Sequence, residues 1–228
     1  MTRQSNHWRL LSLVESSLSV AVFAALLFGV AGTIRWRGAW AWLGLLLGAS
    51  VVMSLLLDPR ILRERVTAPR RRRVRRWDAV WGAAIGVTFF GWLVVMALDT
   101  RFGWTSLPRW ARGVGIVAVA AIYVLSYFAL QANVFASPIV DIQTDTHQTV
   151  VDTGPYGVVR HPLYAAVIWL WPATALVLGS AYGLAMSPLL IALVVVRTVL
   201  EDRTLAAELD GYREYRERVR YRLVPRVW

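Results

Sequence analysis

Two short polar segments, separated by one apolar stretch, hold most of the side chains in this chain that could do chemistry. Residues 160–164 read Arg-His-Pro-Leu-Tyr, and residues 197–202 read Arg-Thr-Val-Leu-Glu-Asp. Arg197 directly follows the apolar run 189–196, and an unpaired guanidinium within a bilayer costs about 2.5–3.5 kcal/mol even on the lowest scales. Such a residue needs a partner or a function. On a helix, Glu201 would place its carboxylate beside Arg197, four residues earlier.

The elements that must position these groups are strongly apolar. Hydrophobic residues make up 57% of the chain, above the roughly 45–50% of soluble domains. Six apolar stretches are each long enough to cross the ~30 Å hydrocarbon core of a bilayer. They are residues 16–34, 39–57, 79–98, 112–132, 163–181 and 184–200. Pro172 interrupts the fifth stretch, so we expect five or six transmembrane helices in an all-α, polytopic membrane protein with no cleavable signal peptide.

The distribution of charge predicts the orientation. All 25 basic residues are arginine. With six spans, nineteen of them fall on one side of the membrane, in the N-terminus, residues 58–78, the fourth connection and the tail. Five fall on the other side. The positive-inside rule therefore puts both termini and the Arg-His-Pro segment in the cytoplasm. We expect the arginines to contact anionic lipid headgroups, and no nucleic acid.

Several kinds of site are excluded by what the sequence lacks. The chain has no cysteine, which excludes disulfides, thiolate nucleophiles and iron–sulfur clusters. Its three histidines, His7, His147 and His161, have no helical metal-ligand spacing, so we expect no metal site. Dinucleotide-binding, nucleotide-binding and hydrolase glycine motifs are also missing.

The chain divides into two functional parts. Residues 1–132 form two apolar hairpins joined by the Arg-rich loop, and we expect them to act as scaffold. Residues 133–228 form the functional region. Within it, residues 139–151 alternate weakly and predict extended chain over the membrane face. Gly154-Pro155 predicts a turn, and Pro162 suits the first turn of the next helix.

A helical pattern continues beyond the last span. Apolar, acidic and aromatic residues recur there at steps of three and four on one face: Glu201, Leu205, Glu208, Tyr212, Tyr215 and Val219. This spacing predicts one amphipathic cytosolic or interfacial helix over residues 201–220. Two acids and two tyrosines would then line a pocket roofed by that helix. The alternative is a helix docked on lipid phosphates through its arginines.

The ordered motifs of residues 131–228 resemble those of the isoprenylcysteine carboxyl methyltransferase family. The resemblance rests on Gly154-Pro155-Tyr156, on residues 160–164, on Arg197-x-x-x-Glu201-Asp202-x-x-Leu205, on Gly211-Tyr212-x-x-Tyr215-x-x-Arg218-Val219, and on Arg222-Leu223-Val224-Pro225. That family and the phospholipid N-methyltransferases form a wider group of membrane methyltransferases. The resemblance implies a multi-helix membrane fold that binds S-adenosyl-L-methionine on the cytosolic side and admits a lipophilic acceptor from the bilayer.

The resemblance also implies roles for individual residues. The implied cofactor contacts are Gln143, Gln148, Thr149, Val150, Val151, Tyr156, His161, Pro162, Leu163, Tyr164 and Glu201. Glu201 corresponds to the cofactor-binding acid, and Arg197 to the residue that meets the carboxylate of the acceptor. The chain departs from the family pattern at Asp202, which replaces a second Glu, and at Ala166, where Gly is common.

The residues themselves suit this chemistry. Displacement at a sulfonium needs no metal and depends mainly on positioning. An anionic acceptor needs a cation, for which Arg197 is the candidate. The alternative is that Arg197 only forms an ion pair with Glu201. An amine acceptor needs a base, for which His161 is the candidate. The leading hypothesis is O-methylation of a lipophilic carboxylate. The alternatives are phospholipid N-methylation, an NADPH-dependent membrane reductase, and a non-enzymatic transport or scaffold protein.

Overall fold

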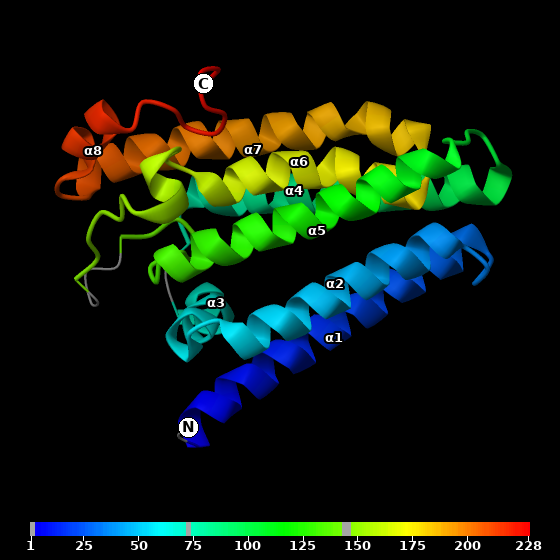
Figure 1. Ribbon diagram of the computed structural model, residues 1–228, viewed down its shortest axis with the longest axis horizontal. Helices are drawn as coiled ribbons and strands as arrows, with labels where there is room; N and C mark the ends of the chain where they lie inside the picture. The colour runs from blue at the N-terminus through cyan, green and yellow to red at the C-terminus, as the bar shows by residue number, and fades with distance from the viewer. Residues whose placement is uncertain (1–2, 72–73, 143–146) are drawn as a thin grey trace.

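The protein is a bundle of long helices (Figure 1). The computed structural model describes residues 3–71, 74–142 and 147–228. Its helices are α1 (Arg3–Ala31), α2 (Arg37–Leu56), α3 (Pro59–Arg71), α4 (Arg76–Phe102), α5 (Arg109–Ala132), α6 (Pro162–Leu178), α7 (Ala181–Glu208) and α8 (Tyr212–Arg218), with one 3₁₀ turn, η2 (Gly154–Gly157). Helices α1, α2, α4, α5 and α7 are long and apolar enough to span a membrane. The predicted all-α, polytopic membrane fold is therefore confirmed.

The fifth apolar stretch forms the shortest of the long helices and one of the most buried. Helix α6 runs without a break through Pro172 and packs against α2, α5 and α7. Two glycines let its backbone approach its neighbours: a Cβ at Gly38 would lie 2.5 Å from the carbonyl oxygen of Val177, and one at Gly115 would lie 2.8 Å from that of Ala173. Close packing at small residues is a main source of helix association in lipid. The 17 residues of α6 rise about 25 Å at 1.5 Å per residue, slightly less than the thickness of the hydrocarbon core.

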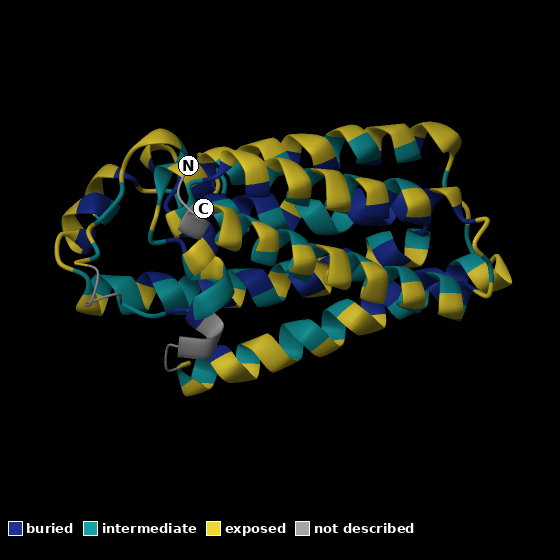
Figure 2. Ribbon diagram, turned by 90° about the horizontal axis from the view of Figure 1, so that it is seen from below, coloured by how far each residue is buried: buried dark blue, intermediate teal, exposed yellow. Residues whose placement is uncertain are grey.

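The outward faces of the long helices are exposed and apolar (Figure 2). Leu18 on α1, Val87 on α4 and Val117 on α5 are 65%, 76% and 70% exposed. Exposed apolar side chains of this number would be costly in water, and a membrane protein places them against lipid tails. The interior is filled by aliphatic, aromatic and small apolar residues, with Leu93, Trp92 and Ala166 fully buried. Alanine at position 166 therefore still permits close helix packing.

The connections between helices divide between the two ends of the bundle. The turns between α1 and α2, between α4 and α5, and between α6 and α7 lie at one end, while α3, α8 and the chain from η2 to α6 lie at the other (Figure 1). Residues 59–71 of the Arg-rich segment, which the sequence suggested to be a loop, form the amphipathic helix α3. Its Ile61 and Leu62 are buried against Leu57 and Leu130. Burial of this apolar face explains why an arginine-rich segment folds as a helix.

We expect the end that carries α3 and α8 to be cytoplasmic, because the arginine-rich segments gather there. The chain lacks cysteine, so single cysteines report accessibility cleanly. Cysteine at exposed Arg60 should be labelled by a membrane-impermeant maleimide only after cells are opened. Cysteine at exposed Ser106, on the α4–α5 connection, should be labelled in intact cells. Labelling of position 60 from outside would reverse this orientation.

Candidate active site

One cavity at the α3–α8 end gathers side chains from several parts of the chain. It holds about 830 Å³ of space, including its open mouth. Its walls are formed by the chain after α5, the segment that precedes η2, the first turn of α6, and the ends of α7 and α8. The lining residues include Asn133, Phe135, Val140, Asp141, Gln148, Thr149, Val150, Val151, Tyr156, Arg160, His161, Leu163, Tyr164, Glu201, Leu205, Tyr212 and Tyr215.

The cavity brings together most of the residues implied as cofactor contacts. Those that line it are Gln148, Thr149, Val150, Val151, Tyr156, His161, Leu163, Tyr164 and Glu201. Pro162 does not line it; it is buried and starts α6, where its missing N–H is not needed. Gln143 lies outside the described residues. The segment before η2 has neither helix nor strand in its described part, so helix and strand hydrogen bonds do not occupy its backbone N–H and C=O groups there.

His161 lies between two acids of α7. Its Nε2 is 3.3 Å from Oδ1 of Asp202, and its Nδ1 is 3.9 Å from Oε1 of Glu201. The ring stacks on Tyr164, with centroids 5.8 Å apart, and the Tyr164 hydroxyl donates to Oε2 of Glu201 at 2.5 Å. The His161 side chain is 4% exposed, whereas that of Glu201 is 22% exposed. Of these two acids of α7, Glu201 is thus the one that a ligand in the cavity can reach.

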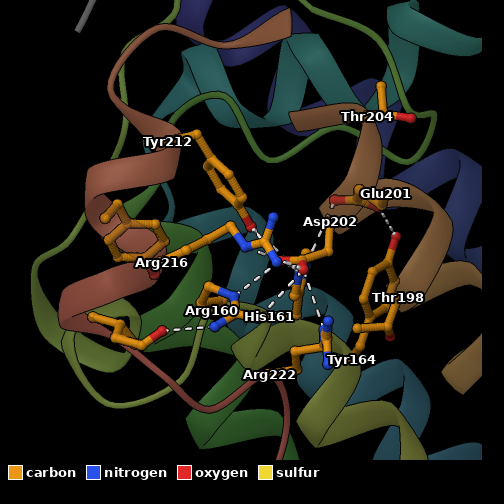
Figure 3. A network of polar contacts seen from close by, with 12 residues as sticks. Arg160, His161, Tyr164, Thr198, Glu201, Asp202, Thr204, Tyr212, Arg216 and Arg222 are labelled. Atoms are coloured by element: carbon orange, nitrogen blue, oxygen red, sulfur yellow. Dashed lines mark hydrogen bonds and ion pairs between the residues drawn. The ribbon is translucent and has the colours of Figure 1, made fainter. Parts of the chain in front are cut away.

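Asp202 is the centre of a buried polar network (Figure 3). Its carboxylate accepts from Nε of Arg160 at 2.9 Å, from the Tyr212 hydroxyl at 2.9 Å, and from Nε of Arg222 at 3.2 Å. The side chains of Asp202 and Arg160 are only 1% and 3% exposed. Sequence reasoning assigned Asp202 no role beyond a departure from the family pair. Its shorter side chain points into the protein and joins α6, α7, α8 and the C-terminal segment.

Arg160 extends this network to the chain that follows α8. Its Nη1 donates to the carbonyl oxygens of Val219 and Arg220, each at 2.8 Å. The backbone N–H of Arg160 also donates to the carbonyl of Tyr221 at 2.9 Å. The arginine of the Arg-His-Pro motif therefore fixes the C-terminal segment beside the cavity, with its charge balanced by Asp202.

The predicted single helix over residues 201–220 is wrong. Helix α7 ends at Glu208, and α8 starts at Tyr212 after Gly211, whose φ of 78° is a left-handed conformation that suits glycine. The prediction of two acids in the pocket is also wrong for Glu208. It points away from the cavity and binds Arg75, with Nη1 to Oε1 at 2.9 Å. Leu205, in contrast, lines the cavity as the spacing predicted.

Three tyrosines form one side of the cavity. Tyr212 and Tyr215 pack edge to face, with centroids 5.5 Å apart, and the Tyr215 hydroxyl donates to the carbonyl oxygen of Tyr156 at 2.7 Å. Burial raises the pKa of Tyr156 to about 12. Burial, with the nearby Asp202 carboxylate, raises the pKa of Tyr212 above its usual range. These phenols therefore stay protonated at neutral pH, and they offer ring faces to a ligand, while the hydroxyls of Tyr212 and Tyr215 donate within the protein.

Arg197 lies one layer behind the cavity wall and does not line it. Its Nη2 is 3.1 Å from Oδ1 of Asp78 on α4 and donates to the carbonyl of Pro138 at 2.7 Å. Its guanidinium carbon lies 4.2 Å from the Trp81 ring centroid and 5.7 Å from that of Tyr164. The expected stacking beside Glu201 is thus not its main contact. Its buried Nε has no hydrogen-bond partner among the described residues.

Three acids at or beside the cavity escaped the sequence reasoning: Asp141, which lines it, Asp78 and Asp202. Asp78 lies in the N-terminal part, which was expected to be scaffold, and Asp202 was treated as a weakened copy of a family residue. One signal was available for Asp78: it is an acid in the first turn of an apolar helix, where the helix dipole favours negative charge. Its pairing with Arg197, 119 positions away, depends on the packing of α4 against α7.

The cavity has the chemistry that a cationic, amine-bearing cofactor requires. Glu201 offers a partly exposed carboxylate, and the tyrosines offer ring faces to a cation. The backbone of residues 148–151 offers further donors and acceptors. S-adenosyl-L-methionine, a sulfonium with an amino acid end and an adenosine end, fits these donor sets.

Comparison with known proteins shows what part of the chain and its fold are similar to. Residues 108–209 match the family model of phospholipid methyltransferase, from the start of α5 to the end of α7. The chain shares its fold with the eukaryotic intramembrane Ras methyltransferase ICMT (isoprenylcysteine carboxyl methyltransferase), with a TM-score of 0.54 and 14% identity over 91% of this chain and 74% of that one. No curated protein sequence matches the chain. Residues 108–209 therefore resemble the phospholipid methyltransferase family, and the chain as a whole has the fold of the membrane methyltransferase ICMT.

Proposed function

We propose that this protein methylates a carboxylate of a lipophilic acceptor, with S-adenosyl-L-methionine as the methyl donor. The observation that carries the proposal is the meeting of Glu201, His161, Tyr164 and the segment 148–151 around one cavity. This cavity lies at one end of apolar helices, so it is close both to water and to lipid. That location suits a polar donor from the cytosol and an acceptor from the bilayer. The family match favours this function over a reductase or a scaffold.

The residues of the chain would divide between donor and acceptor. S-adenosyl-L-methionine supplies an electrophilic methyl group on its sulfonium. Glu201, held by Tyr164, would bind the cationic amine of the donor, while Tyr156 and Tyr212 would enclose it and exclude water. These contacts act by orientation, which is the main demand of an in-line displacement.

Arg197 is the candidate for the acceptor carboxylate. Its Nη2 is occupied by Asp78 and Pro138, but its Nε lacks a partner among the described residues and remains able to donate. The guanidinium lies against Tyr164, which is part of the cavity wall. A shift of that ring would bring Arg197 into contact with an acceptor oxygen. A positive charge held in a low-dielectric wall also favours an anionic acceptor over a neutral one.

A second candidate function is N-methylation of a lipid amine. The observation that favours it is that His161 lines the cavity, whereas Arg197 does not. His161 Nε2 lies 3.3 Å from Asp202 Oδ1, a contact that orients the ring. An imidazole so placed could accept a proton from an ammonium acceptor before methyl transfer.

Glu201→Gln should weaken binding of S-adenosylhomocysteine, because the amide keeps the shape of the carboxylate but loses its charge. At ~100 times the dissociation constant, wild-type protein gains about 2.7 kcal/mol of stability by mass action, a shift that thermal unfolding in detergent detects. Glu208→Gln is the matched control, since Glu208 is on the same helix but faces Arg75. Equal ligand shifts in the two variants would show that Glu201 does not bind the cofactor.

The acceptor is tested directly by product analysis. Membranes that contain the protein are incubated with methyl-deuterated S-adenosyl-L-methionine, and their lipids are examined by mass spectrometry. A labelled methyl ester supports methylation of a carboxylate, and a labelled methylamine supports methylation of a lipid amine. Lipids that gain no label in excess over the Glu201→Gln control would refute both.

A further inference from the structure

Asp78, a buried acid on α4, contacts both Arg197 and the chain segment that lines the cavity. Asp78 binds Arg197 through Oδ1 at 3.1 Å, and its Oδ2 accepts from the backbone N–H of Val140 at 3.0 Å. The side chains of Asp78 and Arg197 are only 3% and 9% exposed. Val140 lines the cavity, and the carbonyl of Pro138 accepts from the same Nη2 of Arg197. The carboxylate and the guanidinium therefore hold the 138–140 turn between them.

The packing around this ion pair makes its geometry specific. Trp81, one turn after Asp78 on α4, covers the guanidinium at 4.2 Å. Its indole N–H donates to the carbonyl of Leu193 on α7 at 2.7 Å. The two helices are thus joined on either side of Arg197. With one edge of the guanidinium fixed by Asp78, the Nε edge is the one without a partner among the described residues.

We propose that Asp78 is a positioning residue of the methyltransferase site, with two separable effects. Through Val140 it holds the wall of the cofactor cavity. Through its charge it balances Arg197 and so limits how strongly the site attracts an anionic acceptor. The second effect rests on the proposed carboxylate acceptor; the first does not.

The two effects are separated by comparing asparagine with alanine at this position. Asparagine would keep an oxygen that accepts from the Val140 N–H but would lose the negative charge of Asp78. Alanine would lose both. Asp78→Asn should therefore leave the dissociation constant of S-adenosylhomocysteine within about twofold of wild type, while Asp78→Ala should raise it about tenfold, the equivalent of one lost hydrogen bond of ~1.4 kcal/mol.

The charge effect is measured with a matched pair of probes, an S-farnesyl cysteine carboxylic acid and its amide. Removal of a negative charge beside Arg197 should tighten binding of the acid relative to the amide by about tenfold in Asp78→Asn. The double variant Asp78→Asn with Arg197→Gln should lose this gain, because the positive charge at position 197 is removed. The double variant is also electrically balanced, so it remains informative if Asp78→Asn alone proves too unstable to purify.

Asp99 provides the control, because it is the other buried acid of α4. It is 1% exposed and accepts from the Thr105 N–H and hydroxyl and from the Ser180 hydroxyl, at the opposite end of the bundle. Asp99→Asn and Asp99→Ala should lower stability. They should change neither the dissociation constant of S-adenosylhomocysteine nor the affinity for the acid probe relative to the amide probe. A purely structural Asp78 would behave in the same way.

The outcomes distinguish the proposal from its premise. If Asp78→Asn and Asp78→Ala change S-adenosylhomocysteine binding equally, or neither does, Asp78 does not position the cavity wall. If Asp78→Asn does not tighten binding of the carboxylic acid probe relative to the amide probe, the proposed charge effect is wrong. If wild-type protein binds neither probe, the proposed acceptor is wrong, and the cofactor comparison still decides the positioning role. If wild-type protein binds no S-adenosylhomocysteine, the proposed function itself fails.

Discussion

Asp202→Ala should be the most destabilising single substitution at the site, with a loss of about 3–5 kcal/mol, as expected when a buried ion pair loses one partner. The variant would leave the guanidinium of Arg160 buried without its anion, and Tyr212 and Arg222 would lose their acceptor. Thermal unfolding in detergent should show a lower midpoint, and the C-terminal segment should become sensitive to protease. Because that segment lies beside the cavity, cofactor binding should fall as well.

Asp152→Ala is the control for this experiment. Asp152 also pairs with an arginine at short range, 2.8 Å to Arg218, but the two side chains are 47% and 62% exposed. An exposed pair of this kind contributes about 0–1 kcal/mol. Comparable losses of stability in Asp152→Ala and Asp202→Ala would contradict the assignment of Asp202 as the centre of the network.

Arg197→Lys and His161→Ala should separate the two candidate acceptors. Lysine retains the charge that pairs with Asp78 but lacks the planar fork of the guanidinium. For a carboxylate acceptor, Arg197→Lys should lower kcat/KM by roughly 10- to 150-fold, the equivalent of one charge-assisted hydrogen bond. For an amine acceptor, Arg197→Lys should be mild and His161→Ala severe, because removal of a proton then limits the rate.

Cofactor binding must be measured as well, so that a loss of folding is not mistaken for a specific loss of turnover. Arg197→Lys should bind S-adenosylhomocysteine nearly as wild type does, since Arg197 lies behind the cavity wall. Folded Arg197→Lys protein that has lost cofactor binding would show that Arg197 serves the donor side or the scaffold. His161 contacts both Glu201 and Asp202, so His161→Ala needs the same control.

The membrane class, the long apolar helices and the part of the chain that forms the candidate cavity could all be predicted from the sequence, because these features depend on local patterns. Apolar runs of membrane length form helices because an isolated segment has no other way to satisfy its backbone hydrogen bonds in lipid. The Gly-Pro turn and the proline at the start of α6 are set by the dihedral limits of a few residues. The family resemblance then located nine cavity-lining residues in order along the chain.

Which polar groups meet could not be predicted in this way, because it depends on how the helices pack. Asp78 and Arg197 are brought together by the packing of α4 against α7, and a helical spacing rule pointed instead to Glu201. Gly211 divides the predicted C-terminal helix, so that Glu208 turns toward Arg75 while Tyr212 turns toward Asp202. Helical periodicity describes one helix at a time. The partner of a buried charge depends on which helices lie side by side, because burial makes an unpaired charge too costly to keep.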